Sequence, residues 1–189
     1  MNPLLSPNPH PLFDQIQPDH IEPALDILLK KAESALGTVT APDFPATWLG
    51  ISAELDVATE KLGIAWGAVG HLNAVADTPE LRAAYNACLP KVTEFWTRLG
   101  ADERLYAKYK AIPAEGLNTE QRQAHKNALR NFVLGGADLE GAQRERFDLG
   151  ASHHRGVHKA HQRPRVGLHR AAHVEQQHEP SGQIGRAHV

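Results

Sequence analysis

Apolar side chains recur at intervals of three and four residues from about position 19 to about Phe147, and this spacing predicts amphipathic α-helices. The first predicted helix covers about 19–36. Pro23 is expected in its first turn, where a missing N–H costs little, and Gly37 at its end. The apolar stripe of this helix consists of Ile21, Leu25, Leu28, Leu29, Ala32 and Leu36.

Two longer helices are predicted after a proline-rich linker at 41–45. The pattern over about 46–75 is too long and too apolar for a loop. It places Trp48, Ile51, Leu55, Ala58, Leu62, Trp66, Val69 and Leu72 at helical intervals. Thr78 followed by Pro79 predicts an N-cap and a first helical position, which open a third helix that extends to about Leu99. Pro90 is expected to kink this helix.

Two further helices complete the predicted fold. A short one is expected over about 102–111, and Asn118 with Gln121 offers a capping box to the next, which should end at Gly135 and Gly136. No segment alternates with period two for long enough to indicate a strand. The sequence therefore predicts an all-α helical bundle as the fold class, with residues 1–147 as one helical domain.

Residues 148–189 have a different composition. They contain no Phe, Tyr or Trp, and their few large apolar residues show no sustained period. Eight of the twelve histidines lie there: His153, His154, His158, His161, His169, His173, His178 and His188. Because such a segment cannot fill a core, we expect it to be disordered.

Histidines four residues apart share one helical face and so raise the question of a metal site. Two such pairs occur, His154 with His158 and His169 with His173. A zinc peptidase motif His-Glu-x-x-His needs Glu after the first histidine, and both pairs have Arg there. The sequence also lacks a Gly-x-Ser-x-Gly motif, a phosphate-binding glycine loop and a Cys-x-x-Cys pair. We therefore expect no catalytic, cofactor-binding or metal-binding residue in this chain.

Other residues capable of chemistry stand singly. His10, His20, His71 and His125 are scattered, and Cys88 is expected to be a small buried thiol. Trp48, Trp66 and Trp96 could line a peptide groove, although their helical spacing favours core packing. Solvated helix faces are expected to carry Asp102, Glu103, Arg104, Lys108, Lys110, Lys126 and Arg130.

Composition excludes several classes of partner. Apolar residues make up 41% of the chain, charged residues 22%, and the formal net charge is -2, so nucleic acid is not an expected partner. No apolar run approaches the roughly 20 residues that cross a bilayer, so no membrane association is expected. The N-terminus lacks the basic region of a secretory signal, so we expect a cytoplasmic protein.

Several short segments together resemble the thimet oligopeptidase family of zinc metallopeptidases. They include Asn2-Pro3-Leu4-Leu5, Pro11-Leu12-Phe13, Pro18-Asp19-His20-Ile21-Glu22-Pro23-Ala24-Leu25, His71-Leu72-Asn73, Thr78-Pro79-Glu80-Leu81-Arg82, Ala84-Tyr85-Asn86, Leu89-Pro90 and Asn127-Ala128-Leu129-Arg130-Asn131-Phe132. The resemblance covers almost all of residues 1–147. It departs from the family at Gly70, where the family pattern has Ser, which affects helix propensity alone.

The resemblance implies the N-terminal part of a larger, mostly helical zinc endopeptidase. Members of the family cleave short peptides in a deep channel, and their N-terminal helices form part of one wall. Their zinc is held by a His-Glu-x-x-His helix and a downstream Glu, beyond the region matched here. The missing C-terminal catalytic region would thus be an intramolecular partner, and this chain alone is expected to be inactive and to bind no zinc.

The resemblance stops near Phe147, and the sequence that follows suggests a shifted reading frame. Its Arg, His, Gly, Pro and Ala content is what a GC-rich coding sequence gives in the wrong frame, and residues 184–189 look like a translated sequencing adaptor. An alternative function is a stand-alone helical binding or scaffold domain. A third is metal binding by the histidine-rich tail. If the helices belong to a larger protein, the isolated chain should expose an apolar face and tend to aggregate.

Overall fold

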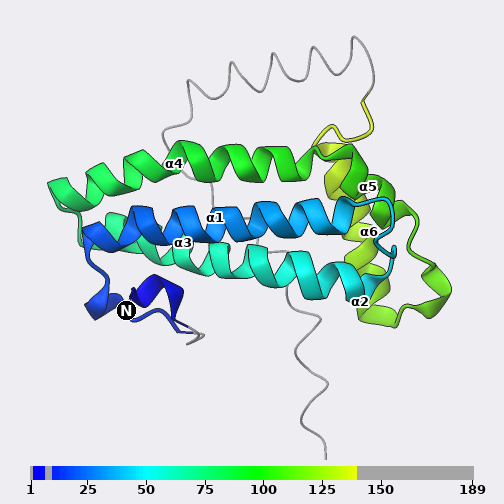
Figure 1. Cartoon of the computed structure of the whole chain (residues 1–189), viewed down its shortest axis with the longest axis horizontal. Helices are drawn as coiled ribbons and strands as arrows, with labels where there is room; N and C mark the ends of the chain where they lie inside the picture. Colours follow the sequence, from blue (N-terminus) through cyan, green and yellow to red (C-terminus); the bar gives the residue numbers. More distant parts are fainter. Residues whose placement is uncertain (1, 7–9, 140–189) are drawn as a thin grey trace, which may run out of the picture.

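The computed structural model describes residues 2–6 and 10–139, and within these ranges all regular structure is helical (Figure 1). The all-α fold class is therefore confirmed. The elements are η1 (Pro3–Leu5), η2 (Phe13–Gln15), α1 (Pro18–Thr40), α2 (Trp48–Ile51), η3 (Ser52–Asp56), α3 (Val57–Val75), α4 (Pro79–Gly100), α5 (Glu103–Lys110), η4 (Ala114–Gly116) and α6 (Thr119–Leu134). The predicted tail, 148–189, and its boundary at Phe147 lie outside the described residues.

The first helix is longer than the sequence predicted at both ends. Pro18 is its first residue, so Pro23 lies beyond the first turn instead of within it. Gly37 does not end the helix, which continues to Thr40 because Val39 is fully buried in the core. The hydroxyl of Thr40 donates to the carbonyl of Leu36 at 2.7 Å, and burial of these last residues outweighs the helix-breaking tendency of one glycine.

The predicted helix over 46–75 is present as α2, η3 and α3, which follow one another without a break. The middle segment η3 is a π-helical turn in which the N–H of Val57 donates to the carbonyl of Ser52. Within it, the hydroxyl of Ser52 donates to Asp56 Oδ2 at 2.8 Å. Ile51 and Leu55 enter one core cluster, and Leu62, farther along the same helix, enters the other.

The predicted caps of the later helices are confirmed. Thr78 accepts a hydrogen bond from the N–H of Leu81 at the start of α4, and α4 continues through Pro90. Asn118 and Gln121 form the reciprocal capping box of α6. Gly135 follows α6, and Gly136 has a φ of 84°, a left-handed conformation that glycine adopts without strain.

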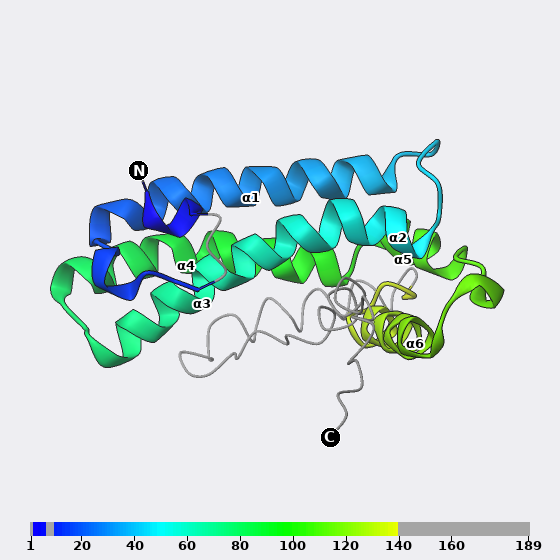
Figure 2. The same cartoon turned by 90° about the horizontal axis from the view of Figure 1, so that it is seen from below.

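The helices enclose two apolar clusters. In Figures 1 and 2 the long helices α1, α3 and α4 lie side by side, and α5 and α6 are packed across one end. The long helices enclose one cluster, which includes Leu25, Leu62, Cys88 and Phe95. The other cluster lies where α1 ends against η3, α5 and α6, and it is built around residues such as Leu105 and Tyr109.

Candidate functional surfaces

Residues 2–6 and 10–139 contain no group of three or more His, Cys, Asp or Glu side chains that could hold a metal ion. The pairs His154 with His158 and His169 with His173 lie outside these ranges. No zinc site can therefore be assigned to the described helices.

Three of the scattered histidines have structural contacts. His20 Nδ1 accepts a hydrogen bond from the N–H of Gln17 at 3.1 Å and so helps to cap α1. The ring of His71 lies edge-on to Phe13, with ring centroids 5.3 Å apart. His125 Nε2 lies 2.7 Å from the carbonyl oxygen of Tyr109, and this contact ties α6 to α5. These contacts account for the three histidines as packing residues.

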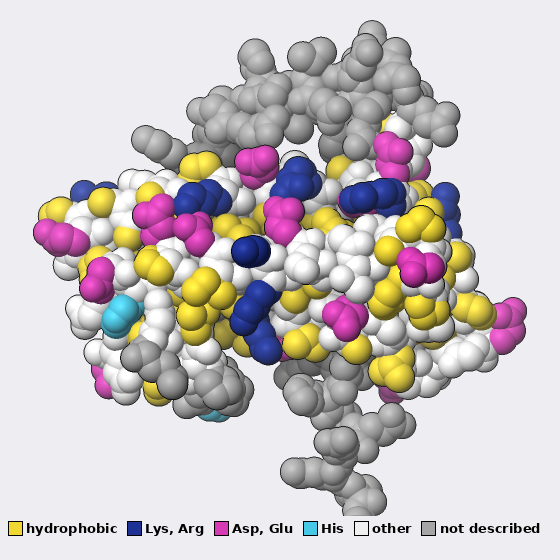
Figure 3. All heavy atoms as spheres, in the orientation of Figure 1, with side chains coloured by type: hydrophobic (Ala, Val, Ile, Leu, Met, Phe, Trp, Pro, Cys, Tyr) yellow, Lys and Arg dark blue, Asp and Glu magenta, His cyan; other side chains and the backbone are white. Residues whose placement is uncertain are grey.

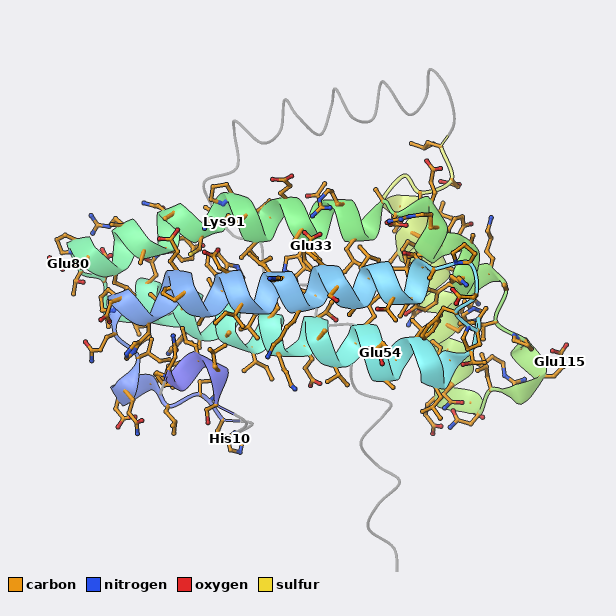
Figure 4. The ribbon with its side chains drawn as sticks, viewed as in Figure 1. His10, Glu33, Glu54, Glu80, Lys91 and Glu115 are labelled. Carbon is orange, nitrogen blue, oxygen red and sulfur yellow. The ribbon has the colours of Figure 1, made fainter. Side chains whose placement is uncertain are left out.

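The N-terminal segment lies against α3 and forms a shallow hollow with it. Figure 4 labels His10, which belongs to this segment. Leu4 and Ile16 come from the segment, and Ile64 and Ala68 of α3 face them across the hollow. Most of the described residues that line it are apolar, and among them His10 is the one ionisable side chain. The hollow therefore resembles a packing defect more than a site for a charged ligand.

Cys88 is fully buried between α1, α3 and α4. Burial raises the pKa of its thiol, and the nearby carboxylates of Glu22 and Asp26 act in the same direction, against the lowering effect of Lys91. A thiol with a raised pKa and no exposed surface is a poor nucleophile. The interpretation of Cys88 as a buried apolar residue is confirmed.

The three tryptophans are half-buried and belong to different parts of the core. Trp48 packs at the end of the bundle, edge-on to Tyr109 and His125. Trp66 and Trp96 pack on the other cluster. Because Trp48 lies on a different cluster from Trp66 and Trp96, the three do not form one groove, and core packing explains them better than peptide binding does.

Ion pairs join α1 to α4 along one edge of the bundle, here called the α1–α4 seam and made up of Glu22, Asp26, Glu33, Lys91 and Arg98. Lys91 Nζ lies 2.9 Å from Glu22 Oε1 and 2.8 Å from Asp26 Oδ1, and Arg98 pairs with Glu33. The bonds to Asp26 and Glu22 raise the pKa of Lys91. Figure 3 shows basic and acidic side chains along this face, and Figure 4 shows Lys91 and Glu33 between the two helices.

Two residues expected on solvated faces have specific contacts instead. Lys108 donates through Nζ to the carbonyl of Phe44, which holds the linker after α1 against α5. Asp102 caps α5, since its Oδ1 accepts from the N–H groups of Arg104 and Leu105 at 2.9 Å each. Burial opposes its ionisation, but these bonds and the guanidinium of Arg104 hold the pKa of Asp102 below its ordinary value.

No helix of the described part of the chain has both the length and the apolar content needed to span a bilayer.

Comparison with known proteins identifies a family for the helical region. Residues 25–144 match the family model described as "Neurolysin/Thimet oligopeptidase, N-terminal domain". Oligopeptidase A of Escherichia coli K12 is 37% identical over 151 residues, which cover 77% of this chain and 22% of that protein. Oligopeptidase A of Haemophilus influenzae is 35% identical over 151 residues, which again cover 77% of this chain and 22% of the relative.

Plant relatives show similar identity. The organellar (chloroplastic/mitochondrial) oligopeptidase A of Arabidopsis thaliana is 35% identical over 151 residues, which cover 78% of this chain and 19% of that protein. The chain thus spans about a fifth of the length of the curated relatives it matches.

Proposed function

Since this chain belongs to the neurolysin/thimet oligopeptidase family, we propose that it forms the N-terminal helical part of an oligopeptidase that hydrolyses short peptides. The observation that carries this proposal is the match of residues 25–144 to the N-terminal domain of the family. The match includes most of α1 and every later described helix. The relatives are named as oligopeptidases, which favours short peptides as substrates.

The chemistry of the proposed reaction is expected to depend on zinc held elsewhere in the whole protein. The described residues do not fit a zinc site, because no three potential ligands converge among them. We therefore assign the proposed zinc ligands, a His-Glu-x-x-His helix and a further Glu, to the length of the relatives that this chain does not span. On this proposal the chain alone neither binds zinc nor cleaves peptides.

The role proposed for the helices is to form part of one wall of a peptide channel. Such a wall has to keep its shape while peptides enter and leave. The ion pairs of the α1–α4 seam and the two apolar clusters support a stiff helical layer of this kind. A stiff wall would exclude folded proteins and admit short, flexible peptides.

The compartment in which the protein works stays a prediction. The plant relatives include a probable cytosolic oligopeptidase A and an organellar one, so family membership is compatible with either location. We propose the cytoplasm, because one plant relative is named as a probable cytosolic oligopeptidase A.

A peptidase assay tests the inactivity of the chain. The purified 189-residue chain, supplied with zinc, should leave a quenched fluorescent oligopeptide intact, while E. coli oligopeptidase A in the same buffer should cleave it. Cleavage by the chain that a metal chelator abolishes would contradict the proposal that its zinc ligands lie elsewhere.

Re-sequencing the source DNA distinguishes the peptidase from the alternative of a stand-alone helical binding domain. The informative region begins at the codons for 146–150. A small correction that opens a long frame encoding His-Glu-x-x-His would support the peptidase. A frame confirmed as written would favour the helical binding domain.

A further inference from the structure

α3 carries fewer charged residues than its neighbours α1 and α4. Glu60 and Lys61 are the charged residues among the 19 residues of α3. By contrast, the 22 residues of α4 include Glu80, Arg82, Lys91, Glu94 and Arg98. A helix whose apolar residues are spread around its circumference is normally covered on most sides. In the described residues α1 and α4 cover its inner side, while Val57 and Val75 remain 45% and 66% exposed.

Three glycines lie together on α3. Gly63, Gly67 and Gly70 follow one another at intervals of four and three residues, which places them on the same side of the helix. A Cβ added at any of them would meet no atom within 4 Å. Glycine costs a helix about 0.5–1 kcal/mol relative to alanine. Packing within the described residues gives no reason for their small size.

An apolar strip of α4 lies beside the glycines. Trp66, in the same stretch of α3, stacks on Tyr85 of α4. Leu89 lies four residues after Tyr85, and Trp96 lies seven residues after Leu89. This spacing places all three on one side of α4. Leu89 is 37% exposed, and Tyr85 and Trp96 are half-buried.

This strip lies on the side of α4 away from the seam. Leu89 and Trp96 each precede a basic seam residue, Lys91 or Arg98, by two positions, which is about 200° around the helix. We define the α3/α4 outer face as Gly63, Gly67, Gly70, Tyr85, Leu89 and Trp96. Figure 2 shows α3 and α4 together on the side of the bundle away from α1.

We propose that the α3/α4 outer face is the docking surface for a helix from the remaining length of the peptidase, with large apolar side chains seated against the glycines. This inference rests on the proposed function. The chain spans 22% of the length of the E. coli relative, so nearly four-fifths of such a protein is available to cover this face. A partner within the same polypeptide also has a high effective concentration. Glycines allow its backbone to approach α3 closely, and the partly exposed apolar side chains of Tyr85, Leu89 and Trp96 favour an apolar contact.

The test is a chimera in which residues 1–144 of this chain replace the matching N-terminal segment of E. coli oligopeptidase A. Two substitutions are compared, Gly67→Leu on the α3/α4 outer face and Gly37→Leu on α1. Both glycines are exposed helical residues with open space around them, so the two changes are matched in chemistry and in local environment. In the isolated chain neither should lower the melting temperature.

In the chimera, Gly67→Leu should lower the melting temperature by several degrees or abolish soluble expression, while Gly37→Leu should leave it unchanged or raise it slightly. Equal behaviour of the two variants, or an unsubstituted chimera that does not fold, overturns the docking proposal. A dimer of the isolated chain that Gly67→Leu alone dissociates would assign the face to a second copy and also overturn it. A folded chimera that cleaves no oligopeptide counts against the proposed function instead.

Discussion

The indole ring of Trp66 and the phenol ring of Tyr85 lie parallel, 8° apart in plane and with ring centroids 4.8 Å apart. This stack joins α3 to α4 at the edge of the apolar cluster. Both rings keep part of their surface exposed, so the contact both stabilises the bundle and shapes its outer face.

The stack should contribute a measurable coupling energy. In a double-mutant cycle with Trp66→Leu and Tyr85→Leu, we expect the two residues to be coupled by about 0.5–1.5 kcal/mol, because stacked rings gain more than their area burial alone. Urea unfolding followed by far-UV circular dichroism gives the four free energies. As a control, Trp96→Leu should be additive with Tyr85→Leu, since the two residues are about 16 Å apart along α4. A coupling near zero for Trp66 and Tyr85 would show that the stack adds nothing beyond burial.

Cys88 should react with iodoacetamide only after the bundle opens. The thiol is fully buried and its pKa is raised, so both access and thiolate formation are suppressed in the folded state. Mass spectrometry across a urea titration should show alkylation rising with the unfolded fraction. Cys88 is the one cysteine of the chain, so the signal needs no assignment.

The matched control moves the thiol to the surface. A chain with Ser34→Cys on a Cys88→Ala background places it at an exposed position of α1 and should react without urea. Equal labelling rates for the two chains in native buffer would refute the buried environment.

The helix caps were predicted correctly from the sequence because each capping side chain and its partner are close in the chain. Thr78 and Asn118 cap helices through residues three positions away. The prediction that Gly37 ends the first helix was wrong. A glycine is a local signal for a helix end, whereas contacts of Val39 with residues far along the chain decide where α1 ends.

Features that depend on distant residues were not predicted. The seam contacts of Lys91 join residues 65 and 69 positions apart, and nothing in the local sequence around Lys91 specifies them. The π-helical turn at Ser52–Asp56 was likewise not predicted, because the sequence pattern over 46–75 is that of one regular helix. For the site, the sequence predicted no functional residue, and the α3/α4 outer face emerged only once the exposed sides of the helices were known.

The N-cap of α5 should give stability that depends on pH. Asp102→Ala should destabilise the chain by about 0.5–2 kcal/mol near neutral pH, because two N–H groups lose their acceptor. The folded pKa of Asp102 is lowered, so its contribution is present above the ordinary aspartate pKa of about 3.9 and is lost as the pH falls through the folded value. Urea unfolding at several pH values should show the difference between the two proteins shrinking in acid.

Asp102→Asn is the control for this cap. Its amide oxygen can still accept the N–H bonds, so the variant should keep most of the cap and should lose less stability in acid than the unsubstituted chain. If Asp102→Asn and the unsubstituted chain lost stability in parallel from neutral to acid pH, the ionised carboxylate would not be the origin of the effect.

Gly135→Ala should destabilise the packing of α6 against the end of α4. A Cβ at Gly135 would overlap the carbonyl group of Gly100 and lie 3.2 Å from the carbonyl oxygen of Asn131, and neither backbone group can move without shifting its helix. Forcing an extra methyl group into such a contact costs about 1–3 kcal/mol. Gly37→Ala is the matched control and should instead stabilise by about 0.5–1 kcal/mol, since the position is open and helical. Opposite shifts in melting temperature for these two substitutions would establish the close approach of α6 to α4, while a stabilising Gly135→Ala would show that the two helix ends are farther apart.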